Sequence, residues 1–450
     1  MKKTYIILCL CLLASSVNLC CQTSIFGEIN TLANQNSIIR DWGNQIIIYA
    51  EDNSSQGYFH LMTGITNGST VLTASAPSGV YVKDFKILND WVYFVGEGEA
   101  ANAKAHVAIV GAFQIYNVFY SSGIIQYTTL QPTFSSDHSP YSALSLLRTE
   151  VYSYDGIVHI MAIGKQTEDL NGILTTAVFD ITYPFLSYRT VPSIFGDKEG
   201  IFFDLALTDN YVVTVAHKGY SYDLFGNGYI MMRPFHRDNN PLASTTGINR
   251  YTSDGYIIPN GIMEATGLSG DMFALSYCEP GTTATAQGIG ILQVNTSGVI
   301  LPVLFKHTGN ILSNSTYYTF KDMVYNAHSG LLCDLSNANS SGDYLVDVFS
   351  STGIGDSRLS HPNIKFNSLC TFSTIYCAAC GNSAASSLGI LLQQLPFGGS
   401  CATSNNVSMS ITYPLLNSDA SITVIEGTMT NPTYHNPNIE TNQFIVNCSK

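Results

Sequence analysis

The sequence predicts an all-β protein, and three observations favour this class. Short apolar segments, alternating or continuous, are bounded by Gly, Asn, Asp and Ser along the whole chain. No long segment shows the helical periodicity of an amphipathic α-helix. A pattern of strand, turn and strand, clearest in KDFKILNDWVYFVGE at residues 83–97, returns several times. With 450 residues, 45% of them hydrophobic, the chain can bury the core of one large repeat domain or of several ordinary domains.

Residues 1–21 are expected to form a signal peptide. Met1-Lys2-Lys3 precedes the apolar run TYIILCLCLLASSVNL, which is shorter than the roughly 20 residues that span a bilayer. The small residues Ala14 and Ser16 fit cleavage after Ser16, whereas lipid attachment would use Cys20 or Cys21. No later segment is long and apolar enough for a transmembrane helix. We therefore expect an exported protein that is periplasmic, extracellular or on the cell surface, with a lipid tether as the alternative to a free chain.

The repeated pattern predicts a β-hairpin with one residue at a fixed distance of five positions before the turn. Asn-Asp, Asp-Gly, Asp-Asn and Ser-Gly pairs tolerate the positive φ that tight hairpins require. The fixed residues and their turns are Asp84 with Asn89-Asp90, Glu150 with Asp155-Gly156, Asp204 with Asp209-Asn210, Glu264 with Ser269-Gly270, and Ser368 with Ser373-Thr374. Asp322 fits if its turn holds two extra residues, and a weaker copy of the hairpin covers residues 38–52.

A second pair of β-like runs follows each hairpin. The expected third strands are residues 57–64, 106–113, 175–181, 228–235, 288–294, 343–349 and 388–395. Four strands in about 50 residues is the period of a β-propeller blade. In its architecture the chain resembles the β-propeller class, which implies seven four-stranded blades within residues 22–400. The Trp-Asp, diglycine and Asp-box signatures of particular propeller families are absent, and several β-sandwich domains in series would be the alternative.

The tail, residues 401–450, lacks the repeat but holds the β-like runs 407–414, 420–429 and 442–448. It is expected to close or cap the propeller by supplying the outer strand of the last blade, or else to form a small β appendage. Residues 22–36 are the rival segment for closing the ring.

The residues at the repeated acidic position are expected to approach the central channel together. They are Asp84, Glu150, Asp204, Glu264 and Asp322. Such a ring could bind a cation or a polyhydroxylated or amine-bearing ligand. Alternatively, each acid accepts hydrogen bonds from backbone amides and fixes the register between blades. The second role is favoured because five like charges around one axis repel unless they are paired, with Lys83, Lys86 and Lys321 as the nearby partners.

Seven cysteines lie beyond the N-terminal region, all after residue 277. A two-residue turn would place Cys370 opposite Cys377, where a cross-strand disulfide is conceivable, and Cys401 and Cys448 could join the ends of the tail. Cys377 and Cys380 would point to opposite faces of a strand, which argues against a metal or redox site. We expect neither a metal nor a cofactor.

Charge and composition limit the function. Only 11% of the residues are charged and the net charge is -13, which argues against binding nucleic acid. The 27 tyrosines suit low-charge recognition. The predicted function is a non-enzymatic binding or scaffold protein of the cell envelope or exterior, which recognises a protein or glycan through blade loops or the channel mouth. The alternative is a glycan-active hydrolase or lyase on the same scaffold.

Overall fold

The computed structural model describes most of the chain, with gaps between the strands. The described residues are 24–32, 36–99, 106–130, 143–167, 174–185, 187–192, 200–218, 229–242, 248–252, 264–280, 284–308, 312–313, 320–336, 345–350, 355–360, 364–372, 376–383, 387–394, 403–405, 409–411, 415–419 and 425–449. Within them the protein is all-β, with one helix, α2 (Ile115–Ser121). None of the described helical residues forms a segment that is long and apolar enough to cross a membrane.

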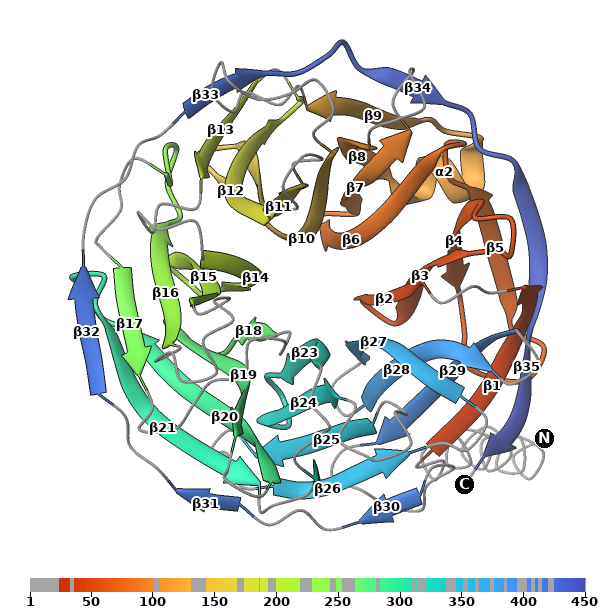
Figure 1. Ribbon diagram of the computed structural model, residues 1–450. Coiled ribbons are helices and arrows are strands. Elements are labelled where there is room, and N and C mark those ends of the chain that lie inside the picture. Colours follow the sequence, from red (N-terminus) through yellow and green to blue (C-terminus); the bar gives the residue numbers. More distant parts are fainter. Residues whose placement is uncertain are drawn as a thin grey trace, which may run out of the picture.

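Antiparallel sheets stand around a central axis like spokes (Figure 1). The largest sheet has nine strands in the order β2-β3-β4-β5-β35-β1-β29-β28-β27. Its strands are β1 (Ser24–Leu32), β2 (Ser37–Trp42), β3 (Gln45–Glu51), β4 (Gly57–Met62), β5 (Thr70–Ser75), β27 (Ile364–Phe372), β28 (Tyr376–Ser383), β29 (Ser387–Gln394) and β35 (Ile439–Ser449). Two four-strand groups, β2 to β5 and β27 to β29 with β1, are thus joined through β35.

Three sheets follow the first group along the chain, each built from four consecutive strands and a fifth from the tail. One sheet holds β6 (Val80–Leu88), β7 (Trp91–Glu99), β8 (His106–Gln114), β9 (Ile125–Leu130) and β34 (Thr433–His435). The next holds β10 (Ala143–Tyr154), β11 (Ile157–Thr167), β12 (Leu174–Tyr183), β13 (Ser187–Pro192) and β33 (Ile425–Thr428). The third holds β14 (Gly200–Leu207), β15 (Tyr211–Lys218), β16 (Tyr229–His236), β17 (Ile248–Thr252) and β32 (Leu415–Asp419).

Two further sheets have the same plan. One holds β18 (Ala265–Gly267), β19 (Met272–Pro280), β20 (Ala284–Val294), β21 (Ile300–Thr308) and β31 (Met409–Ile411), with β22 (Leu312–Ser313) paired to β20. The other holds β23 (Phe320–Asn326), β24 (Leu331–Ser336), β25 (Leu345–Ser350), β26 (Gly355–Ser360) and β30 (Thr403–Asn405). The inner strands, nearest the axis in Figure 1, are β2, β6, β10, β14, β18, β23 and β27.

The predicted hairpins and third strands are confirmed, and several turn geometries follow the residue types. Asn89 and Asp90 have φ of 50° and 64°, and Asp155 has a φ of 47°, all in the left-handed region. The turns after β14 and β18 are wider than the two residues predicted, because Leu207 pairs with Val212 and Gly267 with Phe273.

The predicted turn between β27 and β28 is also too short. Phe372 pairs with Tyr376, which leaves three residues, 373–375, outside the paired strands. This extra residue moves the register by one, so that Cys370 faces Ala378 while Cys377 faces Thr371. The predicted opposition of Cys370 and Cys377 is therefore wrong, because a slip of one residue turns every side chain of a strand to the other face.

The described strands of the tail lie around the circumference, drawn in blue at the rim of Figure 1. From β30 to β34, each tail strand pairs antiparallel with the outermost strand of one sheet, in reverse of their order along the chain. The last, β35, pairs with both β5 and β1. The described tail strands therefore belong to the sheets and form no separate appendage. We call residues 403–449 the belt.

β1 lies beside β29 and completes the last four-strand group, so the N-terminal segment provides this strand while the belt lies outside it. Apolar clusters fill the spaces between successive groups. For example, Phe59 and Phe85 pack between the first two groups with ring centroids 6.0 Å apart, and Phe366 and Leu335 pack between the last two. Ile39 and Ile390 lie in a cluster that joins the last group to the first. The apolar packing is thus continuous around the circle.

Candidate functional site

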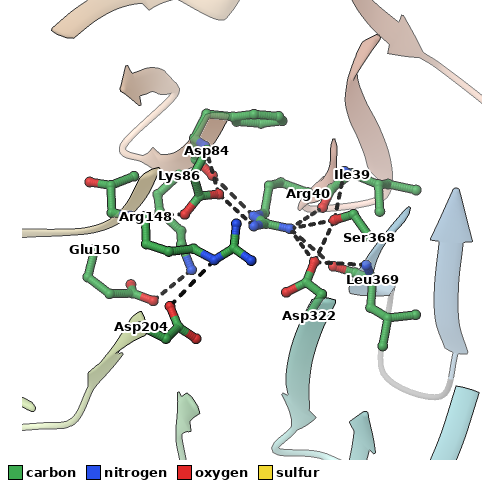
Figure 2. Close-up of polar contacts among 12 residues, drawn as sticks. Ile39, Arg40, Asp84, Lys86, Arg148, Glu150, Asp204, Asp322, Ser368 and Leu369 are labelled. Carbon is green, nitrogen blue, oxygen red and sulfur yellow. Dashed lines mark hydrogen bonds and ion pairs between the residues drawn. The ribbon is translucent and has the colours of Figure 1, made fainter. Parts of the chain in front are cut away.

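A β-bulge aims side chains from the inner strands at the axis. Register shifts fall directly before Asp84 in β6, Asp204 in β14, Asp322 in β23 and Ser368 in β27. A bulge bends its strand and redirects the next side chain. These four side chains consequently converge at the centre of the ring (Figure 2).

The side chain after each of these bulges accepts a hydrogen bond from the backbone of the following group. The pairs are Thr149 N to Asp84 Oδ2 (3.0 Å), Ala265 N to Asp204 Oδ2 (2.7 Å), Leu369 N to Asp322 Oδ2 (2.9 Å) and Ile39 N to Ser368 Oγ (3.3 Å). The last pair links the final group to the first. Such a contact is expected if the residue at the repeated position before each hairpin turn fixes the register between neighbouring sheets.

Arg40, on β2, supplies positive charge to one side of this cluster. Its Nη2 lies 2.7 Å from Asp84 Oδ1 and its Nη1 lies 3.1 Å from Asp322 Oδ2. Nη1 also donates to Ser368 Oγ at 3.0 Å (Figure 2). Burial alone would lower the pKa of Arg40, but the carboxylates of Asp322 and Asp84 outweigh it and raise the pKa. One guanidinium therefore connects four inner strands.

Arg148, on β10, supplies positive charge to the opposite side of the axial cluster. Its Nη2 donates to Glu264 Oε1 at 2.6 Å and to the backbone oxygen of Lys321 at 3.0 Å, and its Nε lies 3.9 Å from Asp204 Oδ1. Only 27% of the Arg148 side chain is exposed. Arg40 and Arg148 stand on two of the inner strands, β2 and β10, and their partners lie on β6, β14, β23 and β27 and at Glu264, directly before β18. Charge-assisted bonds of this kind are stronger than neutral ones.

Glu150 is displaced from the position that the sequence predicts. In β10 the register shift comes before Arg148, two residues earlier relative to the turn than in β6 or β14. Arg148 therefore occupies the place of the acid after the bulge, and Glu150 lies one pleat further along. There its Oε1 accepts from Lys86 Nζ at 2.6 Å. The predicted ring of five equivalent acids is thus four acids and an arginine, with Glu150 beside them.

The two acids next to Arg148 behave as a coupled pair. Burial and the neighbouring carboxylate of Glu264 raise the pKa of Asp204 well above its usual range. Burial also raises the pKa of Glu264, although Arg148 opposes that shift. A hydrogen bond between the two carboxyls favours the proton on Asp204. Both shifts favour a protonated Asp204 beside Glu264, because one guanidinium does not neutralise two buried acids.

Asp322 has the opposite character. Burial alone would raise its pKa, but Arg40, the Ser368 hydroxyl and the Leu369 amide more than compensate, and the pKa is lowered. Its Oδ2 accepts from Ser368 Oγ at 2.5 Å and its Oδ1 accepts from Met323 N at 3.0 Å. Both oxygens of this ionised acid are therefore engaged by the protein itself.

A cavity of about 350 Å³ opens next to the cluster. Its charged lining residues are Arg40, Asp41, Lys86, Glu150 and Asp322, and the rest of its lining combines apolar residues with Thr266, Tyr325 and Thr371. Burial raises the pKa of Glu150, against the effect of Lys86. Among the residues that the structure describes, no group of three or more His, Cys, Asp and Glu side chains has the arrangement of a metal site. The cavity could accept a small polar ligand.

Of the predicted basic partners, Lys86 contacts Glu150, one of the predicted ring acids, at 2.6 Å. Lys83 pairs with Glu97 at 2.8 Å, and Lys321 donates to Asn367 Oδ1 at 2.8 Å. The two central arginines were missed by the sequence prediction. A usable signal was present, because in a chain with only 19 basic residues Arg40 and Arg148 each stand in the first strand of a repeat.

The cysteines only partly match prediction. Cys333, Cys370, Cys377 and Cys380 are buried free thiols, so the conceivable link between Cys370 and Cys377 is not formed. Burial raises the pKa of Cys380 to about 12, which makes it an unreactive thiol. Cys448 is disulfide-bonded. Cys401, its predicted partner, lies outside the described residues.

Comparison with known proteins gives a distant structural similarity and no family. No family model matches the chain, and no curated protein matches it. Among solved structures it is similar to the chain described as "Drosophila Plexin A in complex with Semaphorin 1b", with 8% sequence identity, a TM-score of 0.37, and coverage of 82% of this chain and 88% of that one. A likeness this distant carries no conclusion about function.

Proposed function

We propose that the chain is an exported β-propeller of seven blades that acts as a non-enzymatic binding or scaffold protein at the cell envelope or exterior. The blade count is supported by dividing the nine-stranded sheet at β35, which leaves seven four-strand groups with the other five sheets. It is also supported by the apolar clusters, which pair each group with the next and the last with the first. The proposal of export is supported by the N-terminal sequence, in which Met1-Lys2-Lys3 precedes a short apolar run.

The observation that carries the binding function is the contrast between the axis and the rim. At the axis, the acids and arginines contact one another and neighbouring backbone amides, which stabilises the ring. Toward the rim and the hairpin turns, large side chains are exposed without such partners in the described structure. Tyr116 is 53% exposed and Tyr434 is 64% exposed. Exposed aromatic side chains that a monomer does not need for its core favour recognition.

A glycan-active hydrolase or lyase is the second candidate, and one observation favours it. Glu150 and Asp322 line the same cavity, with the pKa of one raised and that of the other lowered. Two carboxyls with opposite shifts are what a general acid and its ionised partner require. Against this role, Asp322 would have to release Arg40, Ser368 or Leu369 before it could approach a substrate or water.

The test uses the chain from residue 22 onward, purified and applied to immobilised oligosaccharides and to extracellular protein fractions, with reducing-end release measured in parallel. The binding proposal predicts a saturable interaction with no release of reducing ends. Release that is abolished by Glu150→Gln would replace it with the hydrolase. Export is tested separately, by fusing residues 1–21 to a reporter enzyme and measuring its activity outside the cytoplasm.

A further inference from the structure

A pocket of about 420 Å³ lies on the sheet of β6 to β9, away from the axial cluster. Its floor is formed by side chains in two adjacent rows on one face of the sheet. Trp91 pairs with Gln114 in one row, and Ala112, Gln126 and Tyr434 pair across the other. Helix α2 and the residues after it form one wall, which includes Asn117 and Ile124. The volume is within the range of about 300–1,000 Å³ typical of small-ligand sites.

The lining combines aromatic faces with amide groups. Trp91 and Tyr434 provide the rings, and Gln114, Asn117 and Gln126 provide carboxamides. The residues that line the pocket in the described structure include no charged side chain. Asn117 Nδ2 donates to Gln114 Oε1 at 2.5 Å, which orients both amides. Such a lining suits a neutral ligand with both hydroxyl groups and apolar C–H faces.

The Trp91 side chain is held by neighbouring aromatic rings. Trp91 stacks near Tyr93 with centroids 6.4 Å apart and contacts Tyr183 at 5.5 Å. Burial raises the pKa of Tyr183, and the nearby phenol of Tyr434 raises it further. Tyr434 stands on β34, so the belt completes a site whose other residues come from one consecutive part of the chain. A rigid aromatic anchor such as Trp91 lowers the entropy lost on binding.

We propose that this pocket binds a neutral oligosaccharide, with Trp91 and Tyr434 packing against pyranose C–H faces and the Gln114, Asn117 and Gln126 amides bonding to hydroxyl groups. This inference rests on the proposed binding function and names its ligand class. An acidic polysaccharide is disfavoured because no basic side chain among the described lining residues would balance its carboxylates. An apolar ligand is disfavoured because it would leave the amides without partners.

Binding at the pocket can be followed by intrinsic fluorescence, because the chain has two tryptophans, Trp42 and Trp91, and Trp91 lines the pocket. In a Trp42→Phe protein, Trp91 is the single source of tryptophan fluorescence. We would titrate this protein with cellohexaose, xylohexaose, mannohexaose and chitohexaose, and with hexagalacturonate as the acidic comparison. The expected result is a saturable change in Trp91 emission with at least one neutral hexasaccharide and none with hexagalacturonate.

Variants then locate the site. Tyr434→Ala, at an exposed position that should not disturb folding, is expected to raise the Kd about tenfold, and Trp91→Phe should raise it by a similar factor when binding is followed by calorimetry. The matched control is Tyr154→Ala, because Tyr154 is 40% exposed but does not line the pocket. Its Kd should stay within about twofold of the parent value.

Each outcome decides between the two proposals. No binding of any neutral hexasaccharide, or binding that Tyr434→Ala and Trp91→Phe leave unchanged, overturns the oligosaccharide pocket. If the protein binds a component of the extracellular protein fraction but no neutral hexasaccharide, the pocket proposal fails while the binding function stands. If the hexasaccharide is cleaved, the non-enzymatic function fails, and the effect of Tyr434→Ala on the Kd still decides whether this pocket holds the sugar.

Discussion

Arg40 donates from Nη2 to Asp84 Oδ1 at 2.7 Å, across 44 residues of sequence and between two sheets. The same guanidinium reaches Asp322, 282 residues away. Arg40 and Asp84 lie in successive four-strand groups, whereas Arg40 and Asp322 lie in groups near opposite ends of the repeat, so the contact with Asp322 exists only when the ring is closed. We infer that the axial ion pairs favour closure over open arrangements of the same sheets, in addition to the apolar packing between groups.

Arg40→Met is expected to lower the free energy of unfolding by about 3–5 kcal/mol, because it leaves the buried carboxylates of Asp84 and Asp322 without their shared cation. The Asp84 side chain is only 3% exposed, so water cannot replace the guanidinium easily. Urea denaturation followed by tryptophan fluorescence would measure the change.

The control for this substitution is Lys83→Met, which removes a cation from the same region but from a pair with Glu97 that is 20–25% exposed. Its expected cost is below about 1 kcal/mol. Equal losses in the two variants would contradict a special role for Arg40.

Asp322→Asn should lose stability in a pH-dependent way. The folded pKa of Asp322 is lowered, so its ionised form stabilises the fold at pH values above its unfolded pKa of about 3.9. That contribution disappears as the pH falls through the lower, folded pKa. The variant is therefore expected to be less stable than the wild type by about 1.5–3 kcal/mol at pH 7. Denaturation curves at pH 7 and pH 3 should show this difference shrinking, and a constant difference would argue against an ionised Asp322.

Asp204→Asn should have the opposite dependence on pH. Because the folded pKa of Asp204 is raised, ionisation opposes folding, and wild-type stability should fall as the pH rises from about 4 through the folded pKa. The asparagine resembles the protonated acid, since it can accept from Ala265 N and donate to Glu264. The variant should gain stability relative to the wild type between pH 5 and pH 8. A relative loss across that interval would show that Asp204 is ionised in the fold.

Local features of the fold were predictable from sequence because they depend on neighbouring residues. The Asn89-Asp90 and Asp155-Gly156 turns need residues that tolerate positive φ, and those residues are visible in the chain. The third strands were equally visible as apolar runs. The turn at residues 373–375 was misjudged because its extra residue leaves no compositional sign, and that one residue changed the partners of Cys370 and Cys377.

The site and the belt depend on longer-range geometry. The rule that counts back from the turn selected Glu150, but the bulge in β10 lies two residues further from its turn and brings Arg148 to the axis instead. A bulge position is set by packing against the neighbouring sheet and not by residue type alone. Belt strands such as β30 and β31 are only three residues long. Strands this short show no recognisable alternation of apolar and polar residues, and they form where the tail pairs with the exposed edge of each sheet.

The disulfide of Cys448 provides a prediction about the belt. Phe26, on β1, is the cross-strand partner of Cys448, so the end of the belt lies beside the group that contains β29. The belt begins on the neighbouring sheet, at β30. A bond between Cys448 and Cys401 would therefore close the belt around the ring and is expected to stabilise the fold by about 4 kcal/mol for a loop of this length. Peptide mapping by mass spectrometry without reduction should find this pair, and a link from Cys448 to Cys20 or Cys21 would contradict it.

Phe444 is expected to anchor the end of the belt. It is fully buried on β35, in the apolar cluster between the first and last groups, and its backbone bonds to Gly68 and Ser69 beside β5. Gly27 on β1 makes room for it, because a Cβ there would overlap the Phe444 ring. Phe444→Ala should lower the free energy of unfolding by about 3–5 kcal/mol, since a buried ring leaves a cavity when it is removed. Ile445→Ala, on the same strand but 49% exposed, should cost about 0.5 kcal/mol or less. Denaturant unfolding of the two variants, with limited proteolysis to detect a released C-terminal strand, would compare them, and similar stabilities would mean that β35 contributes to the sheet through its backbone alone.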